Sequence, residues 1–217
     1  LAATGLSRSQ MPTLFEGSQV VGELRQAVAE EYGLPSGVQV VAGGGDNAVA
    51  ACGVGAMSEG TGFVSLGTSG VLLAGRDGFC PMVDSAVHTF CHAVPDQWYQ
   101  MGVVLAATDS LNWLSRITGQ SPAALTAELG DTLRAPTKVQ FYPYLSGERT
   151  PHNDSSVRAG FVGLHIATDR AEMTQAVLQG VSFAMRDSLE ALRLTGAKLD
   201  TILAVGGGAR SSYWVEM

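Results

Sequence analysis

The segment VQVVAGGGDNAVAACGVGAM occupies residues 38–57 and joins an apolar run, three glycines and a second apolar run. The segment TILAVGGGARSSYW, residues 201–214, follows the same order. An apolar run that ends in glycines and then changes to a helical pattern is typical of a strand, a tight turn and a helix. In the first unit, Asp46 and Asn47 occupy the position where the helix would be capped. We therefore predict a strand–turn–helix unit at each place.

Between these units the sequence predicts a sheet and several helices. Two short apolar runs, at 61–66 and 71–75, are joined by Gly67-Thr68-Ser69-Gly70, which is typical of a hairpin. The runs at 85–94 and 97–104 extend that sheet through a turn at Pro95-Asp96. Helical spacing of apolar residues is found at 18–32, 105–117, 122–133 and, most clearly, from Asp169 and Glu172 to Gly196.

Composition excludes several classes of protein. The 217 residues carry a net charge of −7, which disfavours a general nucleic-acid or anionic-membrane surface. No apolar stretch approaches the roughly 20 residues of a membrane span. The three cysteines are an odd number in a chain of this size, which indicates free thiols and a cytoplasmic protein. The chain begins at Leu1 and ends in a very short helical segment, so we expect an incomplete chain.

The glycine-rich turns favour phosphate binding, because free backbone N–H groups and a helix N-terminus attract anions. A P-loop is excluded, since neither Lys138 nor Lys198 follows a glycine. Residues 43–48 fit the G-x-G-x-x-A pattern of a dinucleotide site. That match is weak, because Asp46 would place a carboxylate beside the pyrophosphate.

Asp46 has two interpretations at this point. It is either a plain helix cap or a general base, held anionic at the helix N-terminus and able to accept a hydroxyl proton. A carboxylate at the acceptor and glycine-rich loops at the phosphates would suit phosphoryl transfer. Thr68 is likewise either a turn residue or a ligand of the phosphates.

Several segments together resemble the FGGY family of carbohydrate kinases. They are GGGDN, SLGTSG, SAVHTFCH, FYPYLSGERTPHND and VGGGARSSYW, in this order, and residues 159–179 also resemble the family's second signature. The resemblance runs from about Val38 to Met217. It implies an α/β fold with two actin- and hexokinase-like (ribonuclease-H-like) domains that close over a cleft. By this resemblance residues 1–56 are the end of the first, sugar-binding domain and residues 57–217 are most of the second, nucleotide-binding domain.

The resemblance also implies roles for individual residues. Asp46 would deprotonate the attacking sugar hydroxyl, and Asn47 would contact the sugar. The ATP-binding residues would be Gly67, Thr68, Gly207, Gly208 and Ser212, and Ser146 and Gly147 would line the nucleotide side.

The reaction implied is phosphorylation of D-xylulose to D-xylulose 5-phosphate by ATP with Mg²⁺. The alternatives are phosphorylation of gluconate, L-ribulose or glycerol, or a noncatalytic nucleotide-binding module. The family's N-terminal phosphate loop, which helps to place Mg²⁺, has no counterpart in these residues, so no metal ligand is assigned and the 217 residues alone are expected to be inactive. A homodimer is a further implication of the resemblance.

Five other residues have simpler interpretations. His88, Cys91 and His92 could all serve as zinc ligands, but strand geometry would hold the two histidines about 13 Å apart and direct Cys91 to the other face. We interpret them as two histidines on a sheet face and one buried thiol. Cys52 is interpreted as a small core residue. Glu148 and the rest of the polar loop around it are interpreted as solvated.

Overall fold

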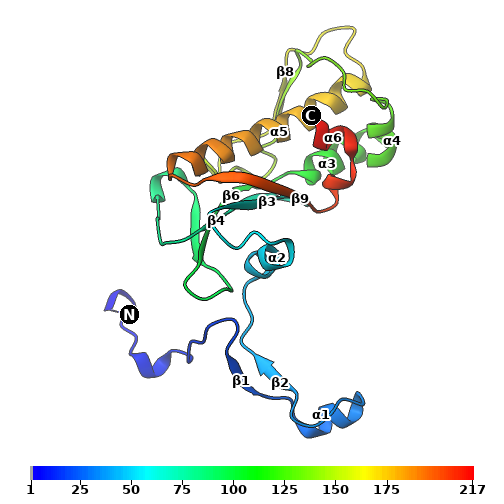
Figure 1. Ribbon diagram of the computed structural model, residues 1–217. Coiled ribbons are helices and arrows are strands. Elements are labelled where there is room, and N and C mark those ends of the chain that lie inside the picture. Colours follow the sequence, from blue (N-terminus) through cyan, green and yellow to red (C-terminus); the bar gives the residue numbers. More distant parts are fainter. Residues whose placement is uncertain (1) are drawn as a thin grey trace.

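The computed structural model describes residues 2–217, and its main body is built on a five-stranded mixed sheet (Figure 1). The order of strands is β5-β6-β4-β3-β9. Neighbouring strands are antiparallel except that β9 runs parallel to β3. The strand bounds are β3 Gly60–Leu66, β4 Gly70–Arg76, β5 His88–Cys91, β6 Trp98–Val104 and β9 Leu199–Val205.

Helices cover both faces of this sheet. The long helix α5, Arg170–Leu194, lies across one face together with α3, Thr108–Thr118, and α6, Ser212–Glu216, while α2, Asp46–Val54, lies on the other (Figure 1). Alternation along β4 produces the two cores, because Leu72 joins the cluster beneath α5 and Leu73 joins the cluster beneath α2. Helix α4, Pro122–Ala127, extends the first cluster through Leu125.

The predicted helix from Asp169 to Gly196 is confirmed. The side chain of Asp169 caps α5 by accepting a hydrogen bond from the backbone N–H of Glu172 at 2.8 Å. Gly180 lets α5 pass directly over the backbone of Phe141, since a Cβ at this position would lie 2.1 Å from the Phe141 carbonyl oxygen. Phe141 belongs to β7, Gln140–Tyr142, which pairs with β8, Gly160–Val162, in a separate ribbon.

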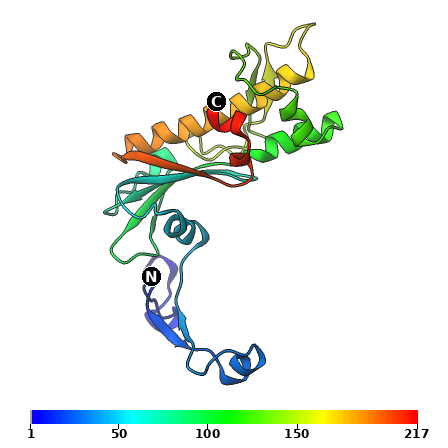
Figure 2. The ribbon, with the colours of Figure 1, turned by 45° about the vertical axis from the view of Figure 1, so that its right-hand side comes forward.

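The N-terminal part of the chain extends away from the five-stranded sheet in both views (Figures 1 and 2). It contains the antiparallel pair β1, Val20–Glu23, and β2, Gln39–Val41, with the short helix α1, Gln26–Glu31, between them. Short 3-10 turns occur at Ala2–Thr4 and Arg8–Gln10 here, and at Val83–Ser85 and Gly208–Arg210 in the main body.

The prediction of one helix from Ser18 to Tyr32 is wrong in its first half. Val20 pairs with Val41 in a strand, so a partner about 20 residues away overrides the local helical spacing. The other predicted elements are confirmed, although α3 and α4 are shorter than the sequence pattern indicated. Together the elements give the α/β architecture expected from the sequence. Within residues 2–217, no helix is both long and apolar enough to cross a lipid bilayer.

Candidate functional site

The turn between β3 and β4 is tied by its carbonyl groups to the start of α3. The Gly67 carbonyl accepts hydrogen bonds from the backbone N–H and the hydroxyl of Thr108, at 2.9 and 2.8 Å. The Thr68 carbonyl accepts from the N–H of Ala107 at 2.9 Å. The side chain of Thr68 is exposed. The turn is therefore rigid on its inner side and offers a free hydroxyl on its outer side.

The second glycine turn follows β9 and packs against the first. Gly206 has φ +90°, and a Cβ there would lie 2.8 Å from the Leu66 carbonyl oxygen. A Cβ on Gly208 would lie 2.8 Å from the Leu66 Cβ and 3.1 Å from the Thr108 Cγ2. A residue with a Cβ would not fit at Gly206 or Gly208, so glycine at these positions lets the second turn pack directly against Leu66 and Thr108. The turn that contains Gly207 and Gly208 thus packs against Leu66, the residue that precedes Gly67 and Thr68.

A hollow of about 450 Å³ opens beside the second turn. Its polar lining residues include Asn112, Arg210 and Ser211. Its remaining lining is largely apolar or small: Thr108, Leu111, Pro122, Ala123, Thr126, Gly207, Gly208 and Trp214. Mostly apolar walls with a few polar groups are typical of small-molecule sites.

Only some of the residues predicted from the sequence to bind ATP line this hollow. Gly207 and Gly208 line it, whereas Ser212 is exposed at the start of α6 and Ser211 takes the place beside the hollow. Ser211 also caps α6 by accepting a hydrogen bond from the N–H of Trp214 at 3.3 Å. Ser146 is exposed, and neither it nor Gly147 lines the hollow.

Asp46 and Asn47 begin α2 on the opposite face of the sheet. The Asp46 Oδ1 accepts hydrogen bonds from the Asn47 N–H at 2.8 Å and from its side-chain amide at 3.4 Å. Asp46 is exposed, while Ala48 and Ala51 on the same helix are buried against the sheet. Burial, and secondly the negative charge of Asp46, raise the pKa of Tyr99. In the described chain, no hydrogen bond joins Asp46 or Asn47 to the glycine turns at Gly67 and Gly207.

Two interpretations of polar residues are corrected. Glu148 is only 3% exposed and is not solvated, because its Oε1 accepts hydrogen bonds from the N–H groups of Leu105 and Arg149. Cys91 is exposed, and His92 lies beyond the end of β5 with 6% exposure. The interpretation of Cys91 as a buried thiol is therefore wrong, and of the two histidines only His88 lies within the strand.

Among the residues that line the hollow, sequence reasoning found Gly207 and Gly208 and missed the others, including four polar residues. Arg210 and Ser211 follow the triple glycine directly, so the turn itself was a signal for them. Thr108 and Asn112 lie on α3, about 95 residues before the second turn, and carry no local signal. Across residues 2–217, no group of three or more His, Cys, Asp and Glu side chains is placed to hold a metal ion.

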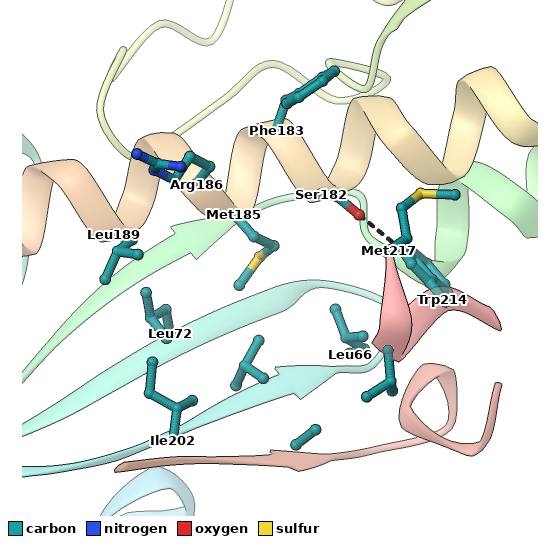
Figure 3. A pocket seen from close by; sticks show the side chains of 13 residues that line it. Leu66, Leu72, Ser182, Phe183, Met185, Arg186, Leu189, Ile202, Trp214 and Met217 are labelled. Carbon is teal, nitrogen blue, oxygen red and sulfur yellow. Dashed lines mark hydrogen bonds between the residues drawn. The ribbon is translucent and has the colours of Figure 1, made fainter. Parts of the chain in front are cut away.

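A second hollow, of about 420 Å³, lies between α5 and the sheet (Figure 3). Met185 and Leu189 face Leu66, Leu72 and Ile202 across it, and the Trp214 indole N–H donates to the Ser182 hydroxyl at 3.2 Å (Figure 3). Arg186 is the one charged group among its described lining residues. This largely apolar lining does not suit a polyanionic nucleotide, so the hollow beside Gly207 is the better candidate.

Two family models match the chain. Residues 62–217 match the C-terminal domain, and residues 1–53 the N-terminal domain, of the FGGY family of carbohydrate kinases. The chain belongs to the FGGY family. The two glycine turns and the hollow of this FGGY chain lie within the C-terminal match, whereas Asp46 and Asn47 lie within the N-terminal match.

Individual relatives of this FGGY chain are xylulose kinases and related proteins. It is 45% identical to a xylulose kinase of Escherichia coli (strain K12), over all of this chain but 45% of that protein's length. A crystal structure from Brucella ovis, described as a xyloylose kinase, is 54% identical with a TM-score of 0.94 and covers 99% of this chain and 44% of its own. A gluconate kinase from Lactobacillus acidophilus, 23% identical with a TM-score of 0.86, covers 98% of this chain and 44% of its own and shares the fold.

Proposed function

We propose that the protein containing this chain transfers the γ-phosphate of ATP to the terminal hydroxyl of D-xylulose, which gives D-xylulose 5-phosphate and ADP. The observation that carries this proposal is the meeting of the two glycine turns at Leu66 and Thr108, beside a hollow of about 450 Å³. The 45% identity to a xylulose kinase supports this choice of sugar. In this proposal residues 1–56 belong to a sugar-binding domain and residues 57–217 to a nucleotide-binding domain.

The glycine turns would hold the nucleotide. The exposed hydroxyl of Thr68 and the backbone of Gly67 are proposed to contact the phosphates, because glycine-rich turns leave N–H groups free for anions. The base and ribose would occupy the hollow beside Gly207 and Gly208, where Asn112 and Arg210 supply hydrogen-bond donors. Ser212, exposed at the start of α6, is proposed to lie toward the ribose.

Asp46 would act as the general base. It is exposed at the N-terminus of α2, where the helix dipole stabilises a negative charge. Its carboxylate would accept the hydroxyl proton while the sugar oxygen bonds to the γ-phosphorus. The bond from that phosphorus to the β,γ-bridging oxygen then breaks, and ADP leaves. Asn47, whose amide lies beside the Asp46 carboxylate, would contact the sugar.

Mg²⁺ would enter with the phosphates of ATP. Magnesium sites in kinases commonly combine one or two carboxylates with substrate phosphates. We assign Mg²⁺ to the phosphates of the nucleotide and name no ligand for it among the residues of this chain. The metal would neutralise phosphate charge as it develops.

The test uses the complete gene product that carries these residues. ADP formation with MgATP should be led by D-xylulose within a panel that includes gluconate, L-ribulose and glycerol. The Asp46→Asn variant should lower kcat by about 10²–10⁴, the usual contribution of general-base catalysis, with unchanged ADP affinity. Preference for another acceptor would correct the substrate, and near-normal turnover by the variant would refute the role of Asp46. Nucleotide binding without turnover of any acceptor would favour a noncatalytic module.

A further inference from the structure

The turn between β5 and β6 touches the glycine turn that precedes Asp46. A Cβ on Gly44 would lie 2.8 Å from the Ala93 Cβ. A Cβ on Gly17 would lie 2.5 Å from the Ala93 carbonyl oxygen, and the Gly43 N–H donates to the Gly17 carbonyl at 2.9 Å. The segments around Gly17, Gly44 and Ala93 are distant in sequence but packed closely together. Gly44 lies two residues before Asp46.

This turn, residues 92–97, is internally fixed, and we call it the brace turn. The His92 N–H donates to the Gln97 carbonyl at 2.9 Å, and the Val94 N–H donates to the His92 Nδ1 at 3.1 Å. The His92 ring is buried with its edge against Tyr99, the ring centroids lying 5.9 Å apart. Because its own hydrogen bonds and a buried ring hold the turn rigid, it can fix the position of the residues that pack against it.

The brace turn also contacts the body of α2. The Cys52 Sγ lies 4.0 Å from the His92 Nδ1, about one and a half turns along the helix from Asp46. Helix α2 is thus held at two points, by Ala93 before its first residue and by His92 in its last turn. Gly44 lies in the N-terminal family match and Ala93 in the C-terminal one, so the contact links the two matched regions.

We infer that the brace turn is a positioning element for Asp46, with Ala93 and Gly44 setting where the carboxylate stands. The inference rests on the proposed role of Asp46 as the general base. Proton transfer requires heavy atoms within about 3 Å, and a displacement of about 1 Å can cost about 10²-fold in rate. A contact with no room for one extra methyl group is close enough to control a displacement of that size.

The test adds a methyl group at Gly44 and then removes the methyl group of Ala93 on the other side of the contact. Gly44→Ala in the complete gene product should lower the single-turnover rate of phosphoryl transfer by about 10- to 100-fold, with the ADP affinity unchanged. Adding Ala93→Gly to that variant should restore most of the rate, because the next neighbours of the new Cβ are the Val49 Cγ1 at 3.4 Å and the Ala93 Cα at 3.6 Å. The matched control is Gly53→Ala on the exposed side of α2, where a Cβ meets nothing within 4 Å.

A wild-type rate in Gly44→Ala, or a loss that Ala93→Gly does not restore, would overturn the inference. If Gly44→Ala does not fold, Ala93→Gly alone decides, since removing the contact should lower the rate by about 2- to 10-fold and an unchanged rate would refute the positioning role. Asp46→Asn is measured beside these variants. Full activity in Asp46→Asn would reject the proposed base itself, whereas an inactive Asp46→Asn beside a fully active Gly44→Ala would reject the brace turn alone.

Discussion

Glu148 accepts a hydrogen bond at its Oε1 from the backbone N–H of Leu105, 3.0 Å away, across 43 positions of sequence. Thr150 makes a similar link, since its hydroxyl accepts from the Val103 N–H at 3.0 Å and donates to the Ala86 carbonyl at 2.9 Å. These side chains fasten the loop around Glu148 to the end of β6. The loop therefore holds the segment that leads into α3 and its first residue, Thr108.

The pKa of Glu148 predicts how this link responds to pH. Burial raises that pKa above the ordinary value of 4.5, so the native protein binds this proton more tightly than the unfolded chain. The stability contributed by the group is fully present below pH 4.5 and is lost as the pH rises through the raised pKa. Glu148→Gln keeps an oxygen acceptor for Leu105 and removes the titration. Thermal midpoints between pH 4.5 and 8 should fall less with rising pH in the variant, and identical slopes would contradict the prediction.

The contribution of His92 to protein stability should depend on pH in the opposite direction. Burial lowers its pKa below the ordinary value of 6.5, with the Ala56 carbonyl opposing part of the shift. The stability associated with neutral His92 is present above pH 6.5 and is lost as the pH falls through the lowered pKa. His92→Asn, whose carbonyl can still accept from the Val94 N–H, should reduce the loss of thermal stability between pH 7 and 5. The control is His165→Asn at an exposed histidine, and a profile that changes equally there would count against His92.

Thr68→Val tests the phosphate contact. The variant removes one hydroxyl and keeps the backbone bonds that fix the turn, so kcat/KM for ATP should fall by about 10-fold or more, as for a hydrogen bond to a charged group. Thr118→Val is the control, because its hydroxyl bonds the Leu114 carbonyl within α3. An unchanged kcat/KM for ATP would remove Thr68 from the site.

Gly208→Ala tests the contact between the two glycine turns. The added Cβ would lie 2.8 Å from the Leu66 Cβ and must push the turns apart. We expect ADP affinity, measured by calorimetry, to fall by about 10-fold because the site is distorted. This change corresponds to about 1.4 kcal/mol of binding free energy. Gly78→Ala, where a Cβ meets nothing within 4 Å, should bind ADP as the wild type does. Equal affinity in Gly208→Ala would show that this close approach does not shape the site.

Local signals explain which parts of the fold could be predicted. The cap at Asp169 and the glycines after β2 and β9 act within a few residues, so their elements were found. The strand at Val20 depends on Val41, a partner that no local pattern reveals.

The same distinction applies to the candidate site. Gly207 and Gly208 were found because a triple glycine is visible in sequence, whereas the choice of Ser211 over Ser212 depends on which residue caps α6. Glu148 and His92 were misinterpreted because their burial comes from segments 40 or more residues away in sequence, such as Leu105 for Glu148 and Cys52 for His92.

Strand β9 has a consequence for the behaviour of the chain at high concentration. It pairs with β3 along one edge, and along the other it has no strand partner among residues 2–217. Ile202 is 39% exposed and Leu203 44% exposed, and neighbouring residues of a strand point to opposite faces. An open edge that is apolar on both sides is a template for a strand from another molecule. The average molecular mass that light scattering gives for these 217 residues should therefore rise with protein concentration, and Leu203→Lys should suppress that rise.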